Sequence, residues 1–165
     1  SGAVDRRWVL SKGSFRASVL ASLFAISLFA IPGVVSATDT LQVSDYHGKV
    51  LVVDFWASWC VPCRRSFPWM NEMQQKYGDE DLVIVAVNLD NEASDAAEFL
   101  RQYPAKFKIS YDPERNLARE FEVEAMPTSF LIDRNGNVIE RHLGFKTGQV
   151  DDYEAAIVSA LRNKP

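Results

Sequence analysis

The sequence predicts an α/β domain, and three observations support this fold class. A valine-rich apolar segment over 49–55 is followed by helical spacing of apolar residues over 60–77 and by a second apolar segment over 82–89. Short apolar runs are typical of strands covered on both faces, whereas apolar residues three and four positions apart indicate a helix. A strand, a helix and a second strand in this order form a βαβ unit with parallel strands and a right-handed crossover.

The later elements are shorter. We expect a helix over 93–103, a strand over 109–111 and a helix over 116–121. Strands over 128–133 and 137–143 flank a turn with Gly136, a hairpin signal because glycine tolerates the positive φ of such turns. Thr147 is a candidate N-cap for a last helix, whose apolar spacing continues over 150–161.

Composition and charge indicate a globular, acidic domain. The chain has 165 residues, 47% of them apolar and 24% charged, with a formal net charge of −4. Residues 1–37 carry four basic residues and one acidic residue, a net charge of +3, so that residues 38–165 carry −7. Phosphate binding needs clustered Lys and Arg, which residues 38–165 lack. We therefore expect a domain that binds no nucleic acid. We also expect this domain to be a monomer.

The first part of the chain has the pattern of an export signal. Basic residues precede an uncharged apolar run over 17–31, and Val35-Ser36-Ala37 supplies the small residues that a signal peptidase reads. We expect a signal peptide over 1–37 and a folded domain over 38–165. The predicted location is the periplasm or another compartment outside the cytoplasm.

Two features of this segment leave alternatives open. The uncharged run over 17–37 is long enough to span a bilayer, which needs roughly 20 residues, so an uncleaved membrane anchor is the rival interpretation. Arg6-Arg7 fits both a plain basic signal region and a twin-arginine signal. Both routes export the domain.

Cys60 and Cys63 are the only cysteines, and they lie where the first strand passes into the helix. Backbone N–H groups and the positive end of the helix dipole favour a thiolate there and lower the pKa of a thiol. The thiolate is the nucleophile, so we assign attack to Cys60 at the helix start and resolution of the mixed disulfide to Cys63. Two cysteines are too few for a disulfide scaffold but suffice for a reversible dithiol.

Asp54 is the second candidate catalytic residue. It lies in the apolar first strand, where burial raises the pKa of a carboxyl. Because strand residues alternate, Asp54 faces the same side as Trp56 while Phe55 faces away. A buried acid near Cys63 can accept its proton during resolution and return it in the reverse reaction. A carboxylate that faces water and an internal hydrogen-bonded brace are the alternatives.

Several motifs together resemble the thioredoxin superfamily. Residues 53–63, VDFWASWCVPC, resemble its active-site segment, and Gly48-Lys49-Val50 is similar to the exported TlpA-like and ResA-like branch. Ala125-Met126-Pro127-Thr128 resembles the loop that contains a cis proline, and Gly144 matches a glycine near the active-site surface. The resemblance covers about residues 40–163.

The resemblance implies a thioredoxin-like fold, a central mixed β-sheet flanked by helices. It also implies an insertion of about twenty residues between Asp90 and Met126. Thioredoxin carries a lysine near the buried acid, on the strand that matches 82–89, and this chain has no lysine or arginine there. We therefore expect Asp54 to lack a cationic partner on that strand.

The resemblance also implies a substrate-binding surface. Pro127 is expected in cis beside the dithiol, with the backbone of Met126 pairing with an extended substrate chain. Trp59 and Pro62 would form an apolar collar around the sulfurs. Gly144 belongs to the same surface.

We expect an exported thiol–disulfide oxidoreductase that reduces disulfides of client proteins and needs no cofactor or metal besides its dithiol. Strong oxidants of the superfamily place a histidine between the cysteines, whereas Val61-Pro62 carries no such charge. In an oxidising compartment a reductant needs electrons, so the resemblance implies a membrane thiol–disulfide donor and clients such as those in cytochrome c or copper-oxidase assembly.

Two alternatives remain at this point. One is a disulfide-forming oxidant, because Arg64 and Arg65 follow the second cysteine and positive charge lowers the pKa of a thiol. The other is a copper(I) metallochaperone that holds the ion through Cys60 and Cys63, with His142 as the only nearby histidine.

Overall fold

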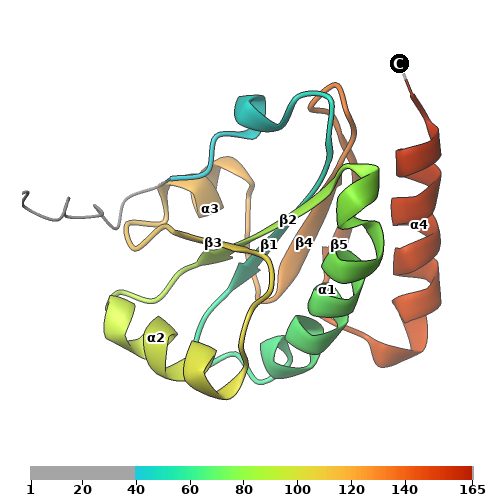
Figure 1. Ribbon diagram of the computed structural model, residues 1–165. Coiled ribbons are helices and arrows are strands. Elements are labelled where there is room, and N and C mark those ends of the chain that lie inside the picture. The colour runs from blue at the N-terminus through green and yellow to red at the C-terminus, as the bar shows by residue number, and fades with distance from the viewer. Residues whose placement is uncertain (1–39, 165) are drawn as a thin grey trace, which may run out of the picture. The chain divides into compact units, whose positions relative to one another are not determined.

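The computed structural model describes residues 40–164 and contains a five-stranded sheet with helices on both faces (Figure 1). The elements are β1 (Val50–Trp56), α1 (Cys63–Tyr77), β2 (Leu82–Asn88), α2 (Ala93–Gln102), β3 (Lys108–Tyr111), α3 (Asn116–Glu120), β4 (Thr128–Ile132), β5 (Val138–Leu143) and α4 (Val150–Arg162). The predicted signal peptide over 1–37 lies outside the described residues. Within 40–164, no helix is both long and apolar enough to cross a membrane.

The sheet has the strand order β3-β2-β1-β4-β5. β1 is parallel to β2, β2 is parallel to β3, and β4 is antiparallel to both of its neighbours. This mixed sheet confirms the predicted fold class and the parallel pairing of the first two strands. β1 lies at the centre, and all seven of its residues are buried, which explains its uninterrupted apolar sequence.

Alternate residues of β1 face two different hydrophobic cores. Trp56 packs against Phe67 of α1, with ring centroids 4.9 Å apart, in the core that α4 also contacts. Phe55 faces the opposite core, where its ring lies 5.9 Å from that of Phe130. The predicted alternation is therefore confirmed, and it places Asp54 on the face that α1 and α4 cover.

The end of the chain follows the prediction for the hairpin but not for the last helix. β4 and β5 pair antiparallel, and Gly136 in their turn has a φ of +85°. Thr147 was predicted to cap the helix, and this was wrong. Thr147 begins a 3₁₀ turn, in which the N–H of Gln149 donates to the carbonyl of Lys146 at 2.9 Å, and α4 starts at Val150 with no side-chain cap.

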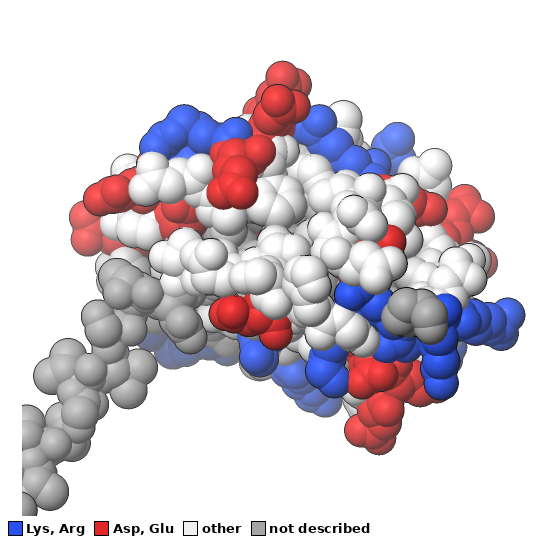
Figure 2. All heavy atoms as spheres, turned by 90° about the horizontal axis from the view of Figure 1, so that it is seen from above, with Lys and Arg blue, Asp and Glu red and all other residues white. Residues whose placement is uncertain are grey.

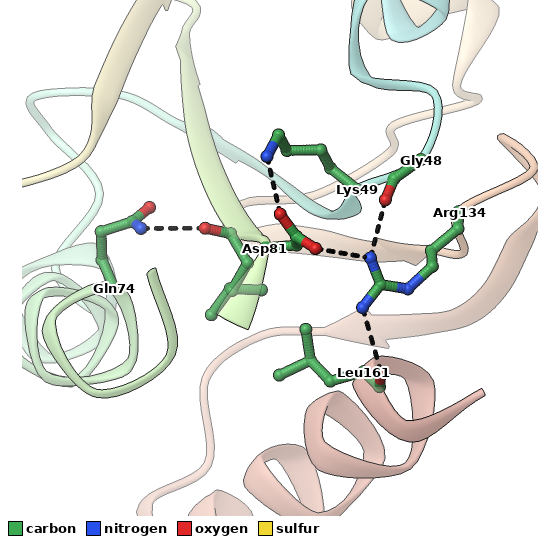
Figure 3. A network of polar contacts seen from close by, with 7 residues as sticks. Gly48, Lys49, Gln74, Asp81, Arg134 and Leu161 are labelled. Atoms are coloured by element: carbon green, nitrogen blue, oxygen red, sulfur yellow. Dashed lines mark hydrogen bonds and ion pairs between the residues drawn. The ribbon is translucent and has the colours of Figure 1, made fainter. Parts of the chain in front are cut away.

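Arg134 fastens the β4–β5 hairpin to three other parts of the domain (Figure 3). Its Nη1 donates to the carbonyl of Gly48 at 2.7 Å and lies 3.0 Å from Oδ2 of Asp81, just before β2. Its Nη2 donates to the carbonyl of Leu161 at 3.1 Å, near the C-terminal end of α4, where a cation is electrostatically favoured. The Arg134 side chain is nearly buried, so these contacts replace water around its charge.

The face of the domain seen in Figure 2 carries charges of both signs. Lys and Arg side chains are interspersed with Asp and Glu side chains around a central area of other residues. This face therefore differs from the clustered basic surface that phosphate binding requires.

We predict that Arg134→Ala lowers the free energy of unfolding by about 3 kcal/mol, because it removes three contacts of a nearly buried guanidinium. Arg65→Ala is the matched control. Arg65 is exposed, so its loss should change the free energy of unfolding by less than about 0.5 kcal/mol. Urea unfolding of both variants measures the effect, and equal stability of the two would contradict the role of Arg134.

Candidate active site

Cys60 and Cys63 form a disulfide between the end of β1 and the start of α1, with sulfurs 2.10 Å apart and Cα atoms 5.4 Å apart. The regular helix begins at Cys63, not at Cys60 as predicted. Cys60 lies in a tighter turn, because the N–H of Cys63 donates to the Cys60 carbonyl at 3.2 Å and that of Arg64 to the Val61 carbonyl at 3.1 Å. Both cysteines are buried in this oxidised form.

Asp90, two residues after β2, holds the loop that precedes Cys60. Its carboxylate accepts hydrogen bonds from the backbone N–H and the hydroxyl of Ser58, both at 2.9 Å, and from Nδ2 of Asn88 at 2.8 Å. Sequence reasoning did not single out Asp90. The available signal was a polar pair, Asn88 and Asp90, at the carboxyl end of a strand predicted to lie beside β1.

Asp54 is fully buried in the middle of the sheet, opposite Ala86 of β2 and Ser129 of β4. The Ser129 hydroxyl donates a hydrogen bond to Oδ1, and no described residue bonds Oδ2. Burial raises the pKa of Asp54 to about 7, against the opposing effect of the Ser129 hydrogen bond. On β2 the residue opposite Asp54 is Ala86, which carries no charge. The alternative of a carboxylate that faces water was wrong.

A cavity of about 30 Å³ lies beside Asp54, between the sheet and the helices α1 and α4. Ser129, Ser66 of α1 and His142 of β5 also line it. Ser66 lies one helical turn after Cys63, and its hydroxyl donates to the Cys63 carbonyl at 3.1 Å. The cavity therefore joins the buried acid to the helical turn that begins at Cys63.

The cis-proline loop contacts the end of β5. The Met126–Pro127 peptide bond is cis, as the resemblance implied. The Pro127 carbonyl accepts a hydrogen bond from the N–H of Gly144 at 2.8 Å. Gly144 has a φ of +74°, a conformation that glycine adopts without strain, and it also lines the cavity beside Asp54.

The remaining predicted binding residues lie around the disulfide. Trp59, directly before Cys60, is 62% exposed, and Pro62 precedes α1 as its N-cap and is partly exposed. Trp59 and Met126 line one surface groove of about 470 Å³. The structure thus brings the residues before Cys60 and before Pro127 to a common groove.

His142 lines the same cavity as the buried acid Asp54. Its Nε2 is 2.9 Å from Oε2 of Glu140, and its ring centroid is 4.3 Å from that of Tyr153. Among residues 40–164, no three His, Cys, Asp or Glu side chains group together in a way that could hold a metal ion. Residue type alone indicates His142 only as a candidate metal ligand.

The mixed sheet, the dithiol at the β1–α1 junction and the cis proline define a thioredoxin-fold protein. The chain belongs to the Redoxin family, which it matches over residues 26–157. It is 35% identical to the thiol-disulfide oxidoreductase ResA of Bacillus cereus and 31% identical to that of Bacillus subtilis, in each case over 114 residues and 68% of this chain. These matches span 66% and 64% of the two relatives, slightly less than two thirds of their length.

One solved structure is more similar in sequence. A Chlorobium tepidum protein, described as a thiol:disulfide interchange protein DsbE, is 50% identical, with a TM-score of 0.72 over 73% of this chain and 86% of that chain. Together these comparisons confirm the resemblance to the thioredoxin superfamily and to its ResA-like branch.

The raised pKa of Asp54 predicts how stability depends on pH. Between about pH 4 and pH 7 the unfolded chain loses the Asp54 proton while the folded protein keeps it, so the free energy of unfolding falls as the pH rises. The Asp54→Asn variant has no carboxyl at this position, so its free energy of unfolding does not show this fall. Relative to the wild type, the oxidised variant should gain up to about 4 kcal/mol above pH 7 and show no such gain below pH 4.

Urea unfolding at a series of pH values measures this difference. Glu72→Gln, which changes an exposed acid on α1, is the control and should follow the wild type at every pH. A difference between Asp54→Asn and the wild type that does not vary with pH would contradict the raised pKa.

Proposed function

We propose that this protein is an exported thiol–disulfide oxidoreductase that exchanges disulfides with client proteins through Cys60 and Cys63. The observation that carries this proposal is the disulfide at the β1–α1 junction of a Redoxin-family fold, with a buried acid, Asp54, on β1 itself. The names of the Bacillus relatives, thiol-disulfide oxidoreductase, support the same reaction.

The reaction has two steps, and the dithiol gives two electrons to the client. The Cys60 thiolate of the reduced protein attacks one sulfur of the client disulfide, and the other client sulfur leaves as a thiolate. A mixed disulfide between Cys60 and the client results. The Cys63 thiolate then attacks the Cys60 sulfur, which forms the Cys60–Cys63 disulfide and releases the second client thiolate.

Asp54 accepts the proton of the Cys63 thiol. Cys63 is fully buried, so water has no direct access to its sulfur in this form. A carboxyl with a pKa of about 7 is present in both protonation states near neutral pH and can take or return a proton. The cavity beside Asp54 also reaches Ser66, which bonds the carbonyl of Cys63.

Clients bind at the surface around the disulfide. The exposed ring of Trp59 offers apolar contact area next to Cys60. Met126 lines the same groove, and its backbone before cis Pro127 suits pairing with an extended client segment. Pro62 and Gly144 complete this binding surface. This binding mode depends on pairing with the client backbone, so it does not require one particular client sequence.

The physiological direction is reduction of the client. Val61-Pro62 places no cation between the cysteines, so the reduced thiolate form lacks the stabilisation that makes a strong oxidant. Residues 1–37 deliver the domain outside the cytoplasm, where a membrane thiol–disulfide protein supplies the electrons. Client proteins with disulfides in cytochrome c or copper-oxidase assembly fit this role.

Redox titration of residues 38–165 against glutathione or dithiothreitol tests the direction. We predict a midpoint potential near that of thioredoxin, about −270 mV. A potential near that of the oxidant DsbA, about −120 mV, would overturn the reductant assignment.

Trapping of mixed disulfides tests which cysteine attacks the client and which one resolves the mixed disulfide. Cys63→Ser keeps the attacking sulfur and lacks the resolving one, so we predict that it accumulates mixed disulfides with clients. Cys60→Ser is the matched control and should accumulate none. Non-reducing electrophoresis and mass spectrometry of the captured proteins provide the measurement, and equal capture by both variants would contradict the assignment.

A further inference from the structure

We propose that His142 carries protons between solvent and the buried carboxyl of Asp54, through the cavity that both residues line. This inference rests on the proposed function, because it concerns the proton that Asp54 takes from Cys63. It gives the edge strand β5 a part in the exchange reaction that the position of the dithiol alone does not indicate.

Three strands place Asp54, Ser129 and His142 in one row across the sheet. Asp54 of β1 is opposite Ser129 of β4, and Ser129 is opposite His142 of β5. Residues directly opposite on neighbouring strands have side chains on the same face, here the face that α1 and α4 cover. The row starts at the fully buried β1 and ends at the sheet edge, where the His142 side chain is 25% exposed.

Polar groups along this row suit proton transfer. The cavity of about 30 Å³ has room for one water molecule. Ser129 bonds Oδ1 of Asp54, and no described residue bonds the buried Oδ2. Glu140 lies 2.9 Å from Nε2 of His142, and an imidazole has a second ring nitrogen, Nδ1, that can donate or accept a proton. A water molecule in the cavity would lie between the strand that carries Asp54 and the strand that carries His142.

The groups around His142 come from three elements. Glu140 on β5 faces Nε2, with its Oε2 at 2.9 Å. Tyr153 of α4 packs on the ring, and Asp54 of β1 lines the far part of the same cavity. Ser66 of α1 and the other residues that line the cavity are uncharged. Asp54 and His142 are therefore the one carboxyl and the one imidazole that line this cavity.

Such a path gives the proton that Asp54 takes up a second route besides its return to Cys63. The Cys63 thiol gives its proton to the Asp54 carboxylate, and the thiolate then attacks the mixed disulfide. Asp54 then either returns this proton to Cys63 when the disulfide is reduced again or passes it on to solvent, to which Asp54 itself has no exposed surface. Transfer to neutral His142 restores the carboxylate and forms an imidazolium, which releases the proton to solvent.

His142→Gln in the full chain tests this path, with insulin as the disulfide substrate and saturating dithiothreitol as the electron donor. We expect kcat near pH 7 to fall about tenfold, because general acid–base transfer is lost. Added imidazole should restore most of the lost activity, since a free base can replace the missing one. A purely structural role of His142 would give no such rescue.

His47→Gln is the matched control, because His47 is the other histidine of the chain and is not among the residues that line the cavity. It should keep the wild-type kcat and respond to imidazole as the wild type does. A normal kcat for His142→Gln would overturn the inference, and so would a loss that imidazole does not reverse.

Asp54→Asn separates the two proposals. If Asp54→Asn is slow and His142→Gln behaves as the wild type, the proton path fails and the proposed function stands. If the wild type itself reduces no insulin disulfide, the proposed function fails. Urea unfolding of His142→Gln establishes that the variant is folded before its kcat is compared.

Discussion

Burial of β1 on both faces is the constraint on which the rest of the structure depends. The strand pairs with β2 on one side and β4 on the other, and all seven of its residues are buried. A carboxyl in such a strand loses its hydration, so the neutral form of Asp54 is favoured and its pKa rises to about 7. The same strand ends at Trp56, from which the chain turns directly into the segment that carries Cys60. One buried strand therefore determines both the raised pKa of Asp54 and the position of the dithiol.

The loops around the disulfide are held by hydrogen bonds from neighbouring strands. Asp90 holds the turn before Cys60 by accepting three hydrogen bonds from Ser58. The backbone N–H of Ser58 donates to both carboxylate oxygens, and the Ser58 hydroxyl donates to Oδ1. Gly144 fixes the cis-proline loop through the carbonyl of Pro127. Each loop is thus anchored at the end of an adjacent strand. The positions of these strand ends therefore determine the shape of the groove that Trp59 and Met126 line.

Much of this arrangement could be predicted because it is local in the sequence. Apolar runs predicted β1 and β2, and strand alternation placed Asp54 on the face of Trp56. The exact helix starts depended on backbone bonds that residue types do not specify. At both Cys60 and Thr147 the chain forms a tighter i→i+3 turn before the regular helix begins.

The partner of Asp54 could not be predicted, because it is distant in the chain. Ser129 is 75 residues away and meets Asp54 only through the register of β1 and β4. The register of β4 and β5 then brings His142 to the same row. Residue type alone suggested a metal ligand for His142. In the structure it shares a cavity with the buried acid Asp54 and lies beside the carboxylate of Glu140 and the ring of Tyr153.

The hydroxyl partner of Asp54 has a chemical consequence. A cation opposite Asp54 on β2 would favour the carboxylate and lower its pKa, but Ala86 occupies that position. The Ser129 hydroxyl opposes the effect of burial only in part, so the pKa stays near 7. A base with this pKa takes and returns a proton with similar ease at neutral pH. Asp54 therefore suits the proposed exchange in both directions, as base when a disulfide of a client is reduced and as acid in the reverse reaction.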